Sequence, residues 1–322
     1  MAKQAVMFKR NPSSDSNIGI SFTQPSQERN RGMPIAIIRG CPHNKCRFCG
    51  FYKTPDGTKR QKFSIRPLAE VKRDILAGKE LARGILGIHS QDGRIRSVFL
   101  GDGDALAVST GYLTELLLFM RANLPDLTSV KAYARVRAIL NKRAALNRLR
   151  EAGLTDVYVG FESGSDEILA MNRKGVVVSD NLSAARMVAE SGIKLHAMVV
   201  SGLGGAERSA EHAQKTADML NAMRMETIMI SRLYPPYPPE RYTRTLGASF
   251  TLLSEEQQVS EEIEMIRRLV MDRPIYVGGF ACCMEYLEAN TRDGMIGKLE
   301  AILGRVRNGE HLIHIASNAG PN

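Results

Sequence analysis

The chain has 322 residues, of which 43% are hydrophobic and 24% are charged, so it can bury a large core and is not disordered, collagen-like or coiled-coil in composition. No uninterrupted apolar run reaches the roughly 18 residues of a spanning helix, and the first ten residues turn polar too early for a secretory signal, so we expect a cytoplasmic protein without membrane contact. The net charge of +10 makes a nucleic-acid partner possible, but no block of five or six basic residues favours one.

Strand-like and helical segments alternate along residues 33–232. Residues 1–32 are polar, show little periodicity and are expected to form an extended arm. Six short β-rich runs are expected to be strands, at 34–38, 98–100, 129–133, 157–161, 196–200 and 227–230. Between these runs, apolar residues recur at steps of three and four, which predicts five helical crossovers.

Local signals mark where several of these helices begin and end. Pro67 is a favourable early helix residue and precedes an apolar stripe formed by Leu68, Val71 and Ile75. Asn141 and Ser179 are expected to cap two later helices, and Gly192 is placed to end the second of them. The fifth helix is expected over about residues 207–223.

Alternation of strands and helices predicts an α/β protein with a parallel sheet and right-handed connections. A six-stranded partial barrel and an open doubly wound sheet both fit this alternation, and periodicity alone does not choose between them. In either fold, functional side chains are expected in the loops at the carboxyl ends of the strands.

A different pattern begins at about residue 233. The stretch 234–239 reads Tyr-Pro-Pro-Tyr-Pro-Pro, which is typical of a stiff, polyproline-like break. Ser254 to Gln257 has the form of a capping box and is expected to open a helix whose apolar face is formed by Val259, Ile263, Ile266 and Val270. Residues 233–322 are therefore expected to form a mixed, mainly helical extension that caps one end of the sheet.

Five cysteines form a tight triplet and an adjacent pair: Cys41, Cys46, Cys49, Cys282 and Cys283. This spacing does not suit a disulfide framework. The triplet follows the first strand directly, and its thiolates can hold three irons of a four-iron, four-sulfur cluster and leave the fourth iron open. Two alternatives remain, which are a structural zinc with His43 or a distant cysteine as fourth ligand, and buried inert cysteines.

The triplet, with Phe48 just before its last cysteine and six strand–helix units behind it, resembles the radical S-adenosylmethionine superfamily. The resemblance covers about residues 33–232 and implies a partial TIM-type barrel. It also implies a 4Fe-4S cluster on Cys41, Cys46 and Cys49, with S-adenosylmethionine on the open iron. In this family the reduced cluster cleaves S-adenosylmethionine, and a 5′-deoxyadenosyl radical abstracts a hydrogen atom from the substrate. Four residues separate the first two cysteines here, whereas three is the commonest spacing.

Two loops after later strands carry residues that the resemblance relates to S-adenosylmethionine. Asp102, Gly103 and Asp104 match a Gly-Gly-Glu-like segment that contacts the methionyl amino group, although Gly and Asp are also ordinary turn residues. Glu162 and Ser163 are implied to face the ribose hydroxyls, while a run of helix-capping serines is the simpler interpretation.

Three further residues are implied to complete the cofactor site. Arg135 ends the third strand and is implied to meet the methionyl carboxylate, with Arg186 as the competing candidate. Gly202 belongs to a glycine-bearing segment that resembles the one beside adenine, and Phe48 is implied to lie near the same ring. The run 163–169 resembles the branch of oxygen-independent coproporphyrinogen oxidase-like and methylthiotransferase-like proteins.

Cys282 and Cys283 admit three interpretations. A thiol near a carbon radical can return a hydrogen atom because its S–H bond is weak, so the pair are candidate hydrogen donors. Free cysteine is also among the most often buried residues. A ligand for a second cofactor is the third interpretation.

The leading hypothesis is thus a radical S-adenosylmethionine enzyme that acts on an unidentified small or medium-sized substrate. An electron donor such as flavodoxin or ferredoxin is implied. The alternatives are a non-catalytic relative that binds cluster, S-adenosylmethionine or haem as a chaperone, an RNA-modifying enzyme of the same family, and a zinc-stabilised binding module.

Overall fold

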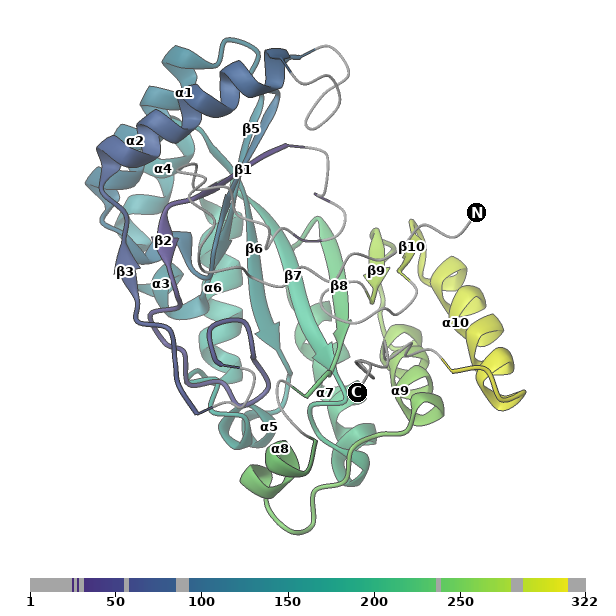
Figure 1. The fold of residues 1–322 in the computed structure, drawn as a ribbon. Helices are drawn as coiled ribbons and strands as arrows, with labels where there is room; N and C mark the ends of the chain where they lie inside the picture. The colour runs from purple at the N-terminus through teal and green to yellow at the C-terminus, as the bar shows by residue number, and fades with distance from the viewer. Residues whose placement is uncertain are drawn as a thin grey trace, which may run out of the picture.

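The computed structural model describes Pro25, Glu28 and residues 32–54, 58–84, 93–235, 239–278 and 286–311. Within these residues, eight strands form one sheet in the order β1-β4-β5-β6-β7-β8-β9-β10 (Figure 1). The strands are β1 (Met33–Ala36), β4 (Ser97–Gly101), β5 (Ser129–Ala134), β6 (Leu154–Glu162), β7 (Lys194–Ser201), β8 (Thr227–Arg232), β9 (Ile275–Val277) and β10 (Leu287–Ala289). All neighbours pair in parallel except β10, which is antiparallel to β9.

This strand order confirms the six predicted strands and selects between the two predicted folds. Strands β1 and β4 to β8 neighbour each other in chain order, as in a TIM-type barrel, whereas a doubly wound sheet reverses its order at a switch point. The described sheet is open, with β1 at one edge and β10 at the other. A separate antiparallel pair, β2 (Ile38–Arg39) and β3 (Ser64–Ile65), lies beside it.

Helices follow most of the parallel strands. They are α1 (Leu68–Gly84), α2 (Thr110–Asn123), α3 (Val136–Asn141), α4 (Leu146–Ala152), α5 (Asp166–Met171), α6 (Val178–Glu190), α7 (Ser209–Asn221), α8 (Pro239–Leu246), α9 (Glu255–Arg267) and α10 (Arg292–Arg307). Figure 1 shows α1, α2, α3, α4 and α6 on one side of the sheet, with α9 and α10 near β9 and β10. None of the described helices is long and apolar enough to cross a membrane.

Each strand divides its side chains between the helix-covered face and an inner face. On β4, Val98 and Leu100 belong to the large apolar core, whereas Phe99 belongs to a small inner cluster with Tyr133, Tyr158 and Met229. Alternation of this kind follows from the two-residue period of a strand. A polar layer adjoins the inner aromatic cluster, because the Tyr158 hydroxyl donates to Glu28 and the Tyr158 ring stacks on His196.

Three local predictions were wrong, each for a local physical reason. Asn141 does not cap a helix start; it is the last residue of α3, and Ala145 precedes α4. Ser179 lies inside the first turn of α6, where Asp180 instead accepts from the Val177 N–H at 3.3 Å. Val270 is 78% exposed, because α9 ends at Arg267 and the helical period no longer places the side chain.

Two other terminal signals are confirmed. The Ser254 hydroxyl accepts from the Gln257 N–H at 3.2 Å, and the Gln257 side chain accepts from the Ser254 N–H at 2.9 Å. Gly192 follows α6 with a φ of +72°, a conformation that side chains other than glycine adopt rarely. The strand expected over 34–38 leaves the main sheet after Ala36, and Ile38 pairs with β3 instead.

The extension after residue 233 contributes more than helices. Its strands β9 and β10 continue the same sheet past β8. The division of the chain at residues 33 and 233 stays a prediction.

Candidate cofactor cavity

A cavity of about 480 Å³ opens at the carboxyl ends of the parallel strands. One wall is the loop after β2, which contributes Cys41, Cys46 and Cys49. The other walls come from the ends of β5, β6, β7 and β8, and Tyr133, Tyr158 and Met198 add apolar surface. The volume falls within the range of small-molecule sites, and mostly apolar walls with a few charged groups are typical of them.

The cysteine loop is fixed by contacts to the last residue of α5 and the residue that follows it. The Arg47 backbone N–H donates to the Asn172 carbonyl at 3.0 Å, and the Arg47 guanidinium donates to the Met171 carbonyl at 2.9 Å. The Lys53 ammonium donates back to the Cys46 carbonyl within the loop. These hydrogen bonds therefore fix the backbone of the loop that carries the three thiols.

Burial sets the protonation of two of the three thiols. It raises the pKa of Cys46, and it raises the pKa of Cys49 to about 12. Both groups are therefore protonated near neutral pH, and metal binding must release these protons.

The arrangement of the thiols bears on which metal group they fit. In the part of the chain that the structure describes, no three Cys, His, Asp or Glu side chains are grouped to hold a single metal ion. The thiolates of an iron–sulfur cluster each bind a different iron. His43 does not join the thiols, because its Nε2 lies 2.8 Å from the Arg173 carbonyl. Three separate thiols facing a shared cavity fit a cluster with one open iron.

Of the three residues in the Asp102-Gly103-Asp104 turn, one lines the cavity and two are buried in the protein interior. Gly103 lines the cavity with a φ of +79°, and an added Cβ would lie 2.9 Å from the Gly40 carbonyl oxygen. Asp102 and Asp104 are buried outside the cavity lining. Asp104 accepts from the Arg135 N–H at 3.1 Å, and burial raises its pKa to about 6. Their predicted contact with an amino group stays a prediction.

Arg135, Glu162 and Phe48 line the cavity together with the cysteines. Glu162 ends β6 with a φ of +68°, which is unusual for a residue other than glycine. Its carboxylate lies 2.5 Å from the Lys174 Nζ, and both side chains are largely buried. The competing candidate, Arg186, is exposed on α6.

Ser163 and Gly202 are buried beside the cavity and do not line it. The Ser163 hydroxyl accepts from the Ser165 N–H at 3.1 Å. The Gly202 N–H donates to the Glu261 carboxylate at 2.7 Å. The predicted ribose and adenine contacts of these two residues stay predictions.

Two charged residues that line the cavity were not predicted from the sequence. Lys174 follows α5 and pairs with Glu162, and Arg232 ends β8 and is held by both carboxylate oxygens of Glu262, each at 2.7 Å. No local motif marks either residue. The one available signal for Arg232 was its position just after the strand predicted over 227–230. Cys282 and Cys283 lie outside the described residues.

The chain matches the family model of the Radical SAM superfamily over residues 35–220. It is 27% identical over 257 residues to an uncharacterized protein of Methanopyrus kandleri, across 72% of this chain and 45% of that protein. The chain therefore spans about half the length of this curated relative.

Two solved structures share the fold. Coproporphyrinogen III oxidase (HemN) from Escherichia coli, a radical SAM enzyme, aligns with a TM-score of 0.51 and 15% identity, over 71% of this chain and 50% of that one. Methylornithine synthase (PylB) aligns with a TM-score of 0.51 and 17% identity, over 76% of this chain and 65% of that one. At these identities the likeness establishes the fold alone.

Proposed function

The chain belongs to the radical SAM superfamily, and we propose that it is an enzyme that binds a 4Fe-4S cluster through Cys41, Cys46 and Cys49 and S-adenosylmethionine in the adjoining cavity. When bound, these groups supply one-electron cleavage of the sulfonium bond and hydrogen-atom abstraction from a substrate. The observation that carries the proposal is that all three thiols line the same cavity as Arg135 and Glu162.

The cavity residues offer complementary contacts for the carboxylate, the ribose and the adenine of S-adenosylmethionine. The Arg135 guanidinium is available to the methionyl carboxylate, and the Glu162 carboxylate can accept from the ribose hydroxyls. The ring of Phe48 offers a face to adenine. Gly103 leaves the backbone open to close approach, because its positive φ and tight surroundings exclude a side chain.

The walls also serve to keep water from a reactive centre. Tyr133, Tyr158 and Met198 are apolar surfaces on the strand side of the cavity. Exclusion of water prevents side reactions and strengthens the polar contacts that remain. The volume of about 480 Å³ supports a small or medium-sized substrate beside the cofactor.

The proposal includes an external electron donor, such as a flavodoxin or ferredoxin. Lys45, Lys59 and Lys62 are exposed around the cysteine loop, so we expect an acidic donor to approach on this side. We place the protein in the cytoplasm, because a reducing compartment keeps cluster thiols available.

Anaerobic reconstitution tests the proposal. The protein is loaded with iron and sulfide, its iron and zinc are measured, and 5′-deoxyadenosine is assayed after dithionite reduction with S-adenosylmethionine. We expect about four irons per chain and nucleoside product, both lost in Cys46→Ala and retained in Lys194→Ala, an exposed control outside the cavity.

The other outcomes each contradict a part of the proposal. Zinc without iron or product would replace it with a zinc-stabilised binding module. A stable cluster that binds S-adenosylmethionine but yields no product under any reductant would indicate a non-catalytic relative.

A further inference from the structure

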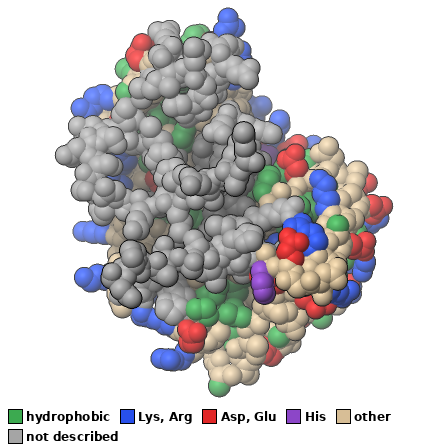
Figure 2. Space-filling view, turned by 45° about the vertical axis from the view of Figure 1, so that its right-hand side comes forward, with side chains coloured by type: hydrophobic (Ala, Val, Ile, Leu, Met, Phe, Trp, Pro, Cys, Tyr) green, Lys and Arg blue, Asp and Glu red, His purple; other side chains and the backbone are tan. Residues whose placement is uncertain are grey.

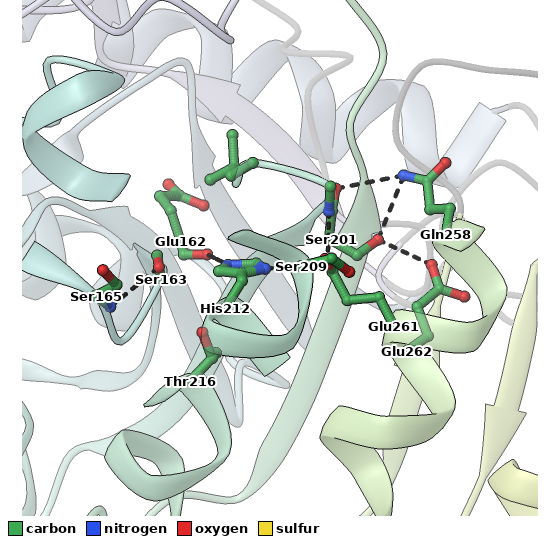
Figure 3. Close-up of polar contacts among 12 residues, drawn as sticks. Glu162, Ser163, Ser165, Ser201, Ser209, His212, Thr216, Gln258, Glu261 and Glu262 are labelled. Carbon is green, nitrogen blue, oxygen red and sulfur yellow. Dashed lines mark hydrogen bonds and ion pairs between the residues drawn. The ribbon is translucent and has the colours of Figure 1, made fainter. Parts of the chain in front are cut away.

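Helix α9 carries three buried polar side chains on the side that meets β7 and α7. Figure 3 shows Gln258, Glu261 and Glu262 projecting from α9 toward the end of β7 and the start of α7. The side chains of Glu261 and Glu262 are fully enclosed. Buried carboxylates destabilise a fold unless they are fully hydrogen-bonded. The hydrogen-bond partners of these carboxylates therefore show which segments they hold together.

Glu261 collects three donors from two segments next to the cavity. Its Oε1 accepts from the Gly202 N–H at 2.7 Å and lies 3.0 Å from the His212 Nδ1. Its Oε2 accepts from the Ser209 hydroxyl at 2.6 Å. The carboxylate therefore joins the loop after β7 to the first turn of α7.

His212 continues this chain of contacts to the cavity wall. Its Nε2 lies 3.4 Å from the backbone carbonyl oxygen of Glu162, and its side chain is fully enclosed (Figure 3). The Glu261 carboxylate and the Glu162 carbonyl are both hydrogen-bond acceptors. The His212 ring can donate to both of them only when each of its two nitrogens carries a proton.

The backbone at Glu162 needs such support. Its φ of +68° lies in the left-handed region, and the pairing of β6 with β7 shifts register between Gly160 and Glu162. A residue other than glycine stays in this conformation only where its surroundings fix it. Because the Glu162 side chain lines the cavity, the orientation of its peptide sets where its carboxylate points.

We propose that the Glu261–His212 pair is a positioning device through which helix α9 fixes the backbone of Glu162, and with it the direction in which the Glu162 carboxylate points into the cavity. This inference rests on the proposed binding of S-adenosylmethionine. It gives the extension a part in forming the cofactor site from outside the cavity.

Two substitutions of His212 separate the contacts. Asparagine places its amide nitrogen near the position of the histidine Nδ1, so His212→Asn keeps the bond to Glu261 and loses the one to Glu162. Glutamine reaches the position of Nε2, so His212→Gln keeps a donor for the Glu162 carbonyl. Thr216→Val is the matched control, because Thr216 is equally buried one turn later on α7 and accepts from the Gly164 N–H at 3.0 Å.

Affinity for S-adenosylmethionine is measured by calorimetry on the cluster-loaded protein, with the melting temperature of each variant recorded. Because the proposed device needs both contacts, His212→Asn and His212→Gln should each weaken binding about tenfold, whereas Thr216→Val should weaken it about twofold or less. His212→Asn and Thr216→Val should lower the melting temperature by similar amounts. Equal affinity losses in those two variants, or none in His212→Asn, would overturn the inference.

Combination with Glu162→Ala shows whether His212 acts through Glu162. Without a carboxylate at position 162 there is no group to place, so adding His212→Asn should weaken binding no further. Additive losses would mean that His212 acts by another route. If the wild-type protein itself binds no S-adenosylmethionine, the proposed function fails, and that result is distinct from wild-type binding that His212→Asn leaves unchanged.

Discussion

Asp104 shows how a single buried carboxyl group makes stability depend on pH. Burial raises its pKa from 3.8 to about 6, so the folded state holds the proton more tightly than the unfolded state does. The stabilising contribution of the protonated form is complete below about pH 4 and is lost as pH rises through 6.

Replacement of Asp104 by asparagine should remove this pH dependence. The asparagine amide cannot ionise and still offers an oxygen to the Arg135 N–H, so Asp104→Asn should be more stable than wild type by roughly 3 kcal/mol at pH 8 and about equally stable at pH 4. Urea unfolding at both pH values measures the difference. A constant offset between the two proteins would show that ionisation of Asp104 is not the cause.

Gly164 is a residue whose lack of a side chain decides local packing. A Cβ there would lie 2.0 Å from the backbone oxygen of Lys215 on α7, and backbone cannot give way as a flexible side chain does. We expect Gly164→Ala to lower the free energy of unfolding by about 3 kcal/mol or more. Gly297→Ala is the control, since nothing lies within 4 Å of its Cβ position inside α10, and it should raise stability by about 0.5–1 kcal/mol. Similar values for both variants would contradict the packing argument.

At the residue scale, sequence predicted best the location of side chains that stand in a local pattern, while their roles stay predictions. The cysteine triplet, Glu162 and Arg135 all stand directly after a strand or at its end, and all of them line the cavity. His212 and Glu261 lie 49 positions apart, on α7 and α9. No local pattern predicts such a pair, because it depends on how two helices pack.

At the scale of single elements, the cap predicted for α9 was correct and the cap predicted for α6 was wrong. The Ser254 hydroxyl accepts from the Gln257 N–H at the start of α9, whereas Ser179 is exposed within the first turn of α6. Ser254→Ala should therefore lower stability by about 1 kcal/mol, while Ser179→Ala should change it by no more than a few tenths. Thermal unfolding of both variants checks this. A cost at Ser179 as large as that at Ser254 would mean that Ser179 caps α6 after all.

Long elements with a clear period were predicted well, and short ones were missed. The six parallel strands and the helix after Ser254 follow from spacing and capping alone. The short strands β9 and β10 have three residues each, too few to show a period. The ladder bonds to their neighbours define such strands, and sequence does not show which neighbours they have.

At the scale of the whole molecule, charge is distributed unevenly around the cysteine loop. Residues 39–66 contain eight Lys and Arg residues and a single acidic one. Figure 2 shows Lys and Arg side chains along the outline of the molecule, with Asp and Glu interspersed, chiefly on its right-hand side. The cysteines line the cavity from this segment, while Lys59 and Lys62 are exposed and outside the lining. One segment thus presents thiols inward and cations outward.

This arrangement predicts how a protein electron donor and a small reductant should differ. Attraction between the basic segment and an acidic donor speeds their encounter and is screened by salt. Reduction of the loaded protein by flavodoxin should slow about tenfold or more between low and physiological ionic strength, whereas reduction by dithionite should change little by comparison.

Charge-reversal variants test whether the faster reduction by flavodoxin depends on the basic residues of the cysteine loop. Lys59→Glu combined with Lys62→Glu should slow reduction by flavodoxin and leave reduction by dithionite and iron content unchanged. The control combines Lys194→Glu and Arg224→Glu, because both residues are exposed at the amino-terminal ends of β7 and β8, opposite the end of the strands where the cavity lies. This control makes the same change in net charge. Equal slowing in both double variants would assign the effect to the total charge of the molecule and remove the cysteine-loop face as the docking surface.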